Sequence, residues 1–148
     1  MRDKIEEYFN TLPDDYSITF YSCSVFITNA IHALVMNNIV YFFIFTGLFI
    51  TSVVMRMYTN IYTMILDKIA IGLVVLYGGN IFLDKLNNDG IFKNILLNGL
   101  ILLTFLLTIF LYSYGYIVGG YCFGENGDTW HGLMHCISSV GHHLILLL

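Results

Sequence analysis

The chain has 148 residues, of which 57% are hydrophobic and 11% are charged, and its mean hydropathy is +0.76. A soluble domain has about 45–50% apolar and about 25% charged residues, so the composition excludes a soluble globular protein and indicates an integral membrane protein. The formal net charge of −4 also excludes a nucleic-acid-binding protein, which needs a basic surface.

Apolar stretches separated by polar breaks predict the membrane topology. Residues 1–16 are polar, carry charges of both signs, and predict an amphipathic lead-in rather than a signal peptide. Transmembrane helices are then expected over 17–36, 38–55, 61–79, 94–113 and 129–148, with loops over 80–93 and 114–128. The expected fold is a single all-α domain over 1–148, a polytopic membrane bundle of about five transmembrane helices.

Five alternating spans bring unusual residues to one face of the membrane. The second span ends with Ser52 and Arg56, the third begins near Asp67, and the fifth opens with His131 and His135. Because successive spans reverse direction, these positions lie in the same leaflet. The opposite loop carries Lys85 and Lys93, whereas the loop before the fifth span carries Glu125 and Asp128 and no base, which favours a lumenal or outer position for this face.

The last span carries four of the five histidines. His131 and His135 are four residues apart, so their side chains share a helix face at about 6 Å, within reach of one metal ion. His142 is near the same face but about 10 Å deeper. We expect it to pair with His32 or Asn29 of the first span, and we expect His143 to point elsewhere.

Each polar residue also has a purely structural interpretation. The HxxxH spacing arises by chance in many helices. Asp67 is followed by Lys68, which would compensate its charge near the interface. Ser52 can bond the carbonyl four residues back, as membrane serines commonly do. Arg56 alone would be an interfacial anchor whose charged end extends to water.

Other readings of the cysteines and histidines remain open. Cys23 and Cys122 are expected near the same face of the membrane, and they could form a disulfide if the compartment on that side is oxidising. Cys136 is expected to be a small buried residue. Di-iron desaturases need several histidine boxes, and only one is present here. Haem ligation could use His32 with His142, with no further support.

Two segments carry a resemblance to a known superfamily. SVVMRMYTNIYTMILDKIAIGLVVLYGG contains Ser52 and Asp67 fifteen residues apart, and WHGLMHCISSVGHHLILL contains HxxxH with a glycine six residues after the second histidine. Both resemble the CREST superfamily of seven-span membrane hydrolases, which includes alkaline ceramidases, adiponectin-receptor-like proteins and lipases that remodel GPI anchors. The resemblance covers roughly residues 40–80 and 128–148.

The resemblance implies a zinc site with one important departure. His131 and His135 match two metal ligands of the superfamily, and Ser52 and Asp67 match its serine and aspartate. The third metal histidine is replaced by Arg56, and a guanidinium donates only and cannot bind a metal. Asp67 or a loop carboxylate such as that of Asp128 would have to complete the zinc site.

Two functions follow as expectations. In the first, the protein is a zinc-dependent hydrolase of lipid amide or ester bonds, with Ser52 and Asp67 orienting water and moving its proton. In the second, Arg56 fills the metal position, and the protein is a non-catalytic relative with a lipid-binding or structural role. Membrane lipids are the expected partners in both, and the sequence does not specify an oligomeric state.

Overall fold

The computed structural model describes residues 17–90 and 93–148, so the polar lead-in expected over 1–16 lies outside the described residues. The described part is helical and contains no strand, which confirms the expected all-α bundle. Its elements are α2 (Ser17–Ser22), α3 (Val25–Val35), α4 (Ile39–Met57), α5 (Ile61–Asp89), α6 (Ile95–Ile109), the π-helix η1 (Phe110–Tyr114), α7 (Gly115–Val118), the 3-10 turn η2 (Tyr121–Phe123) and α8 (Gly127–Leu146).

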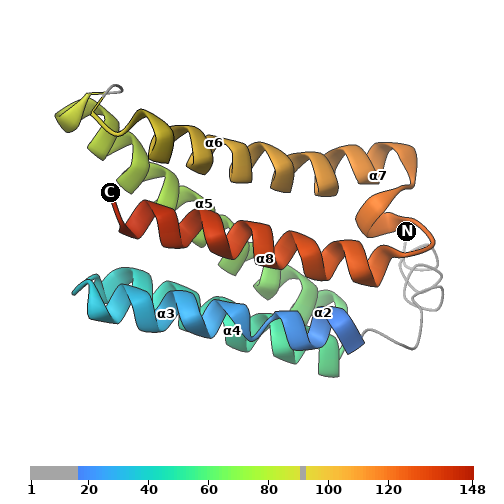
Figure 1. Cartoon of the computed structure of the whole chain (residues 1–148). Helices are drawn as coiled ribbons and strands as arrows, with labels where there is room; N and C mark the ends of the chain where they lie inside the picture. The colour runs from blue at the N-terminus through green and yellow to red at the C-terminus, as the bar shows by residue number, and fades with distance from the viewer. Residues whose placement is uncertain (1–16, 91–92) are drawn as a thin grey trace.

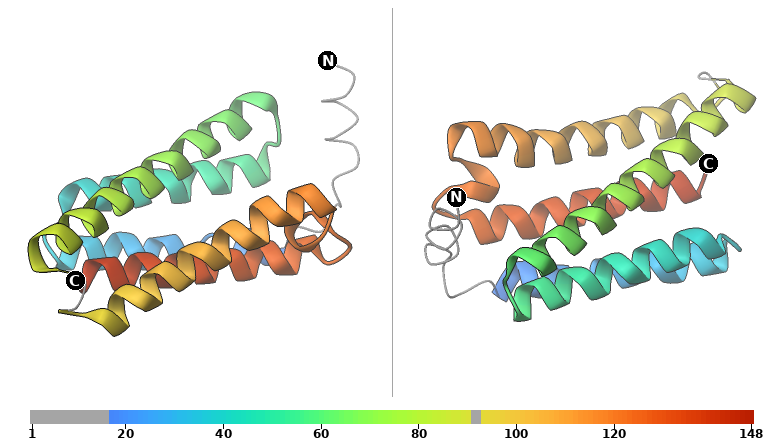
Figure 2. Two further views of the ribbon diagram at one scale, coloured as in Figure 1. Left: turned by 90° about the horizontal axis from the view of Figure 1, so that it is seen from above. Right: turned by 180° about the vertical axis from the view of Figure 1, so that it is seen from behind.

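The helices lie side by side with α8 in the middle of the bundle (Figure 1). The α2–α3 and α4 segments lie on one side of α8, and α6 lies on the other. α5 crosses behind α8, as the two further views show (Figure 2). α8 therefore packs against α2, α3, α5 and α6, which come from every part of the described chain.

Four segments are long and apolar enough to cross a membrane: Ile18–Val35, Ile39–Met57, Ile61–Asn88 and Ile95–Val118. Their outer surfaces are rich in exposed hydrophobic side chains, such as Leu76 at 74% and Ile117 at 79% exposure, as a lipid-facing surface requires. α8, the fifth expected span, is not among these four. Its four histidines, three glycines and two serines lower its hydropathy, and neighbouring helices surround it instead.

Several element bounds differ from the predicted spans. The first span is broken by a turn at Cys23 and Ser24, which separates α2 from α3. The segment expected as a loop from residue 80 continues α5 to Asp89, because Gly90, with φ of 79°, is the first residue to leave the helical conformation. The fourth span likewise continues through η1 and α7 to Val118.

A capping box fixes the start of α5. The Asn60 side chain accepts hydrogen bonds from the backbone amides of Tyr62 and Thr63 at 2.9 and 3.0 Å, and the Thr63 hydroxyl accepts one from the Asn60 amide at 3.1 Å. These bonds satisfy amide groups that the first turn of a helix leaves open. The cap sets where α5 turns back against α4, and so places Asp67 opposite the end of α4.

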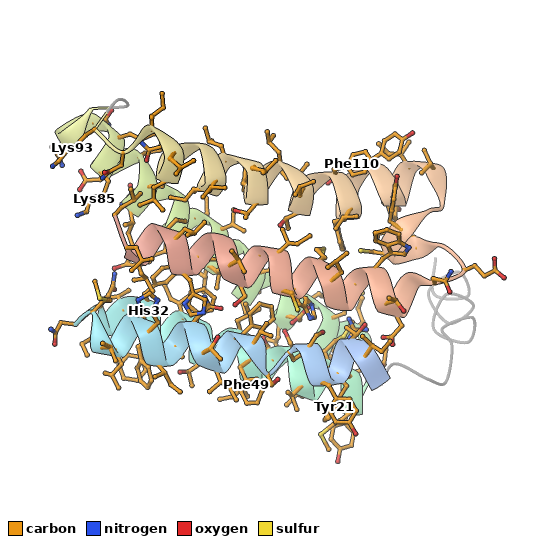
Figure 3. All side chains as sticks on the ribbon, in the orientation of Figure 1. Tyr21, His32, Phe49, Lys85, Lys93 and Phe110 are labelled. Carbon is orange, nitrogen blue, oxygen red and sulfur yellow. The ribbon has the colours of Figure 1, made fainter. Side chains whose placement is uncertain are left out.

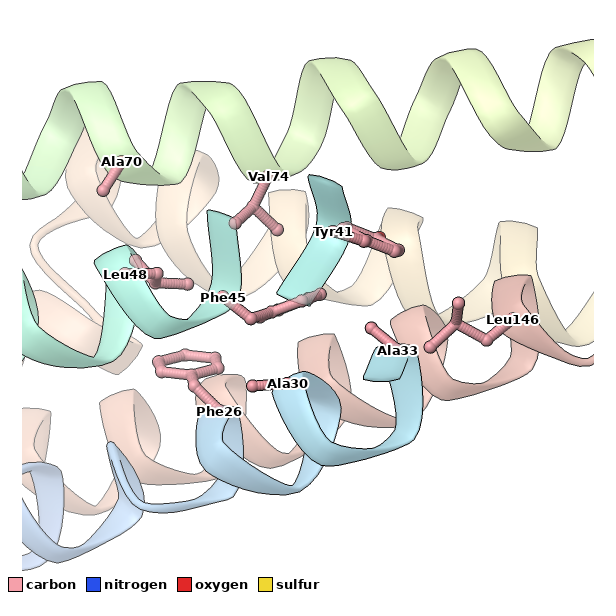
Figure 4. Close-up of a cluster of buried hydrophobic side chains, with 9 residues drawn as sticks. All are labelled: Phe26, Ala30, Ala33, Tyr41, Phe45, Leu48, Ala70, Val74 and Leu146. Atoms are coloured by element: carbon pink, nitrogen blue, oxygen red, sulfur yellow. The ribbon is translucent and has the colours of Figure 1, made fainter. Parts of the chain in front are cut away.

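An apolar core fills the space between α3, α4, α5 and α8 (Figure 4). Tyr41 and Phe45 of α4 are fully buried, and their ring centroids lie 4.7 Å apart. Phe26 of α3 lies 6.5 Å from Phe45 and 5.0 Å from the imidazole of His135. This packing positions the imidazole near the start of α8.

Polar side chains link α3 directly to α8 at mid-bundle. The side-chain amide of Asn29 donates to the carbonyl of Ser139 at 2.9 Å, and the Ser139 hydroxyl donates to Asn29 Oδ1 at 2.6 Å. Asn29 is fully buried and Ser139 is 4% exposed. Two reciprocal bonds satisfy groups that would otherwise be costly in an apolar interior, so they fix how the two helices pair.

Candidate functional site: a polar cluster at one end of the bundle

Ser52 and Asp67 meet where α4 ends and α5 begins. The Ser52 hydroxyl donates to Asp67 Oδ1 at 2.6 Å, and the two residues are only 6% and 7% exposed. Ser52 therefore bonds across helices rather than to the carbonyl of its own preceding turn. The pair joins two helices through a charge-assisted hydrogen bond.

Arg56 lies one turn beyond Ser52 and points to the start of α8. Its guanidinium donates toward Nε2 of His131 at a separation of 3.4 Å. The imidazoles of His131 and His135 have centroids 4.9 Å apart at an interplanar angle of 81°. The helix ends expected to converge therefore do converge, with residues of α4 bonded to both α5 and α8.

Ser22 of α2 is a further member of this site that the sequence interpretation missed. Its hydroxyl donates to the carbonyl of Thr19 at 2.9 Å, so it accepts from Nδ1 of His135, which lies 2.8 Å away. A hydroxyl has a single proton, and this arrangement leaves the lone pair of His135 on Nε2. Small and polar residues three and seven apart on one face of the first span, at Thr19, Ser22 and Asn29, carried the missed signal.

Lys68 turns away from Asp67 to a different partner. Its ammonium donates to the Tyr112 hydroxyl at 2.8 Å and lies 4.8 Å from the centroid of that ring. The Tyr112 ring in turn packs edge-on against His131, at 6.5 Å between centroids. The suggested local pairing of Asp67 with Lys68 is replaced by two separate contacts, and Lys68 adds a second cation beside the imidazoles.

The carboxylate of Asp128 caps the start of α2. It accepts from the backbone amides of Ile18 and Thr19 at 2.9 Å each, and a short hydrogen bond joins it to the Thr19 hydroxyl. These bonds satisfy two open amides and place a negative charge at the positive end of a helix. Both oxygens of Asp128, one of the two carboxylates considered as a third zinc ligand, are thus engaged.

The described residues contain no group of three or more His, Cys, Asp or Glu side chains placed to hold a metal ion. The side chains of His131 and His135 lie close enough to share a metal ion. No third ligand is placed beside them among the described residues. In its place, the lone pair of His131 Nε2 faces the guanidinium of Arg56. A side-chain cation therefore lies beside the imidazole pair, one helical turn beyond the Ser52 hydroxyl that bonds to Asp67.

The deeper histidines differ from their expected pairing. His142 bonds through Nδ1 to the Tyr41 hydroxyl of α4, not to His32 or Asn29. His143, expected to point elsewhere, is the residue that meets His32. The error has a simple origin, because side chains of α4 as well as of α3 reach the end of α8, and a helical-wheel angle cannot tell the two helices apart.

All three cysteines are free thiols. Cys23 is buried and its thiol donates to the Thr19 carbonyl at 3.2 Å, while Cys122 contacts the sulfur of Met134 at 4.0 Å. Cys136, expected to be buried, is exposed. A disulfide between Cys23 and Cys122 is not formed.

Comparison of the chain with protein-family models, curated protein sequences and solved structures gives no match. The resemblance to the seven-span hydrolases therefore stays a prediction from the motifs.

Proposed function

We propose that this chain is a non-catalytic, multi-pass membrane protein that binds the anionic headgroup of a membrane lipid at the Arg56 cluster. We define this cluster as Ser52, Arg56, Asp67, Lys68, Tyr112, His131 and His135. The observation that carries the proposal is the contact of Arg56 with His131 Nε2 at 3.4 Å. By the resemblance, this permanent cation takes the place of the third metal histidine of the superfamily.

The charges of the cluster favour an anion as ligand. A guanidinium is always charged and presents a planar set of donors that matches phosphate oxygens. Arg56 is only half-buried, so part of its side chain is accessible. The exposed Lys68 bonds to Tyr112, whose ring packs against His131. The buried carboxylate of Asp67 has its own donor in Ser52. Two cations at the end of the bundle can therefore act on a phosphate at headgroup depth.

Lipid binding by the purified full chain tests this proposal. Titration of nanodisc-embedded protein with phosphatidic acid against phosphatidylcholine should show preference for the anionic lipid. Arg56→Gln should weaken that preference about tenfold or more, because a hydrogen bond to a charged group contributes about 1.5–3 kcal/mol. Lys85→Gln is the matched control, since Lys85 lies at the opposite end of the bundle (Figure 3). Equal loss in both variants, or no lipid preference, would refute a headgroup site at Arg56.

A second candidate is the zinc-dependent lipid hydrolase. It is favoured by the imidazole pair at 4.9 Å and by the Ser52–Asp67 hydrogen bond. His131 and His135 would hold the zinc, which when bound acidifies a water molecule. Asp67, oriented by Ser52, would accept the proton of that water, and Arg56 would stabilise the negative charge on the substrate oxygen.

Metal analysis separates the two candidates. An active hydrolase should carry about one zinc per chain at the imidazole pair, and this zinc should be lost in both His131→Ala and His135→Ala. If Arg56 replaces the metal, the wild type binds no zinc at this pair. Arg56→His should then create a site with three histidines, and zinc binding should appear. A zinc ion that is present in the wild type and depends on His131 would reject the non-catalytic proposal.

A further inference from the structure

A second pair of imidazoles lies at the opposite end of the bundle from the Arg56 cluster. His32 is in the last turn of α3, and His143 is in the last turn of α8. Their Nδ1 atoms are 2.8 Å apart and their ring centroids 5.0 Å apart. Figure 3 labels His32 beside the end of α8, far from Tyr21 of α2. Both side chains are half-buried, so part of each ring is accessible at this end of the bundle.

Thr28 fixes which nitrogen of His143 carries the proton. The Thr28 hydroxyl donates its only proton to the Val25 carbonyl at 2.6 Å. It therefore accepts from Nε2–H of His143, which lies 3.0 Å away. Nδ1 of His143 is then unprotonated, and its lone pair points at His32. A histidine oriented by a hydrogen bond from its second nitrogen is the usual form of a metal ligand.

The spacing of the two rings suits a shared metal ion. With metal–nitrogen distances of about 2.0–2.1 Å, two imidazoles on a tetrahedral ion have ring centres about 5 Å apart and nitrogens about 3.3 Å apart. The ring centres of His32 and His143 are already at 5.0 Å. A tilt of the rings that opens the nitrogens from 2.8 Å would admit an ion in place of the shared proton.

The surroundings of the pair also favour a cation. The carbonyl ends of α3 and α8 both lie here, and each carries the partial negative charge of a helix C-terminus. The pair at His131 and His135 has almost the same ring spacing, but there Arg56 donates to an imidazole nitrogen. No arginine contact of that kind is found at His32 or His143 among the described residues.

We propose that His32 and His143 form a binding site for a divalent transition-metal ion of the zinc type, with Thr28 as the positioning residue and water completing the coordination. The site is separate from the Arg56 cluster and does not depend on its function. Two imidazole ligands suit zinc, cobalt(II) and copper(II) alike, so cobalt(II) provides a spectroscopic probe.

Cobalt(II) titration of the purified full chain tests the proposal. Visible absorption typical of tetrahedral cobalt(II) should saturate near one ion per chain, and added zinc should displace it. His32→Ala and His143→Ala should each abolish this signal, whereas His131→Ala should retain it. A signal lost in His131→Ala and kept in the other two variants, or no cobalt binding by the wild type, would overturn the assignment.

Two less disruptive variants test the site without removing a histidine. Thr28→Val removes the acceptor for His143 and should weaken cobalt binding about tenfold or more, as loss of a ligand-orienting bond does. Thr46→Val is the matched control, because that hydroxyl donates only to the Phe42 carbonyl at 2.8 Å. Equal affinity in the two threonine variants would contradict the role assigned to Thr28. Any zinc measured in the wild type must also be assigned with these variants before it is ascribed to His131.

Discussion

Removing the bonds between Asn29 and Ser139 should measure how firmly α3 holds α8. Ser139→Ala removes the hydroxyl that donates to Asn29 Oδ1, so that oxygen loses this hydrogen bond. Asn29→Ala removes both hydrogen bonds and opens a cavity at a fully buried position. Hydrogen bonds between membrane helices contribute on average about 0.6 kcal/mol and at most about 1.7 kcal/mol. We therefore expect a loss of about 0.6–1.7 kcal/mol for Ser139→Ala and about 1–3 kcal/mol for Asn29→Ala.

The double variant provides the decisive comparison. Once Asn29 is alanine, Ser139→Ala should have almost no further effect, so the coupling energy should be about 0.6–1.7 kcal/mol. Unfolding in mixed micelles can be followed by helical circular dichroism and by the single tryptophan, Trp130, at the start of α8. Ser138→Ala, which changes the neighbouring and less buried serine, is the control. A coupling energy of zero would mean that α8 does not pair with α3 in this register.

Three further outcomes follow from other features of the structure. Gly132→Ala would place a methyl group 2.7 Å from Ile18 Cγ2, so it should destabilise the α2–α8 contact by about 1–3 kcal/mol in the same unfolding assay, whereas Gly72→Ala, with open space around it, should not destabilise the protein. Asp128→Ala should lower stability by about 0.5–2 kcal/mol, because it removes the cap of α2; an unchanged unfolding midpoint would contradict this role. Burial raises the pKa of the Cys122 thiol to about 11. The reactive thiolate of Cys122 is therefore scarce at neutral pH, and its alkylation rate in a single-cysteine variant should rise about tenfold per pH unit from 7 to 10; a plateau near pH 9 would show an ordinary thiol.

The convergence of the site followed from the sequence because it depends on helix order alone. Alternating spans had to bring the ends around Ser52, Asp67 and His131 to one side, whatever their packing. The partners of each residue did not follow, because they depend on helix rotation. The contact of Ser22 with His135 requires knowing which face of α2 meets α8, and composition does not specify it.

The predicted helix bounds were wrong where composition and helix propensity disagree. Residues 80–89 are polar enough to look like a loop, yet they contain no glycine or proline before Gly90. Phe82 also packs against Ile101 and Ile145 in a second apolar cluster. Burial on one face therefore holds this amphipathic segment helical beyond the stretch that hydropathy marks as membrane-spanning.

The polarity of α8 has a consequence for how the protein is made. A helix with four histidines inserts poorly into lipid on its own, because its polar side chains are costly in the bilayer. The four apolar segments that precede it can each enter the bilayer independently. Biogenesis should therefore be ordered, with α8 entering only when its neighbours can offer Ser22, Asn29 and Tyr41 as partners. A shortened chain lacking α3 should accordingly leave α8 outside the bilayer, open to proteases and quality control.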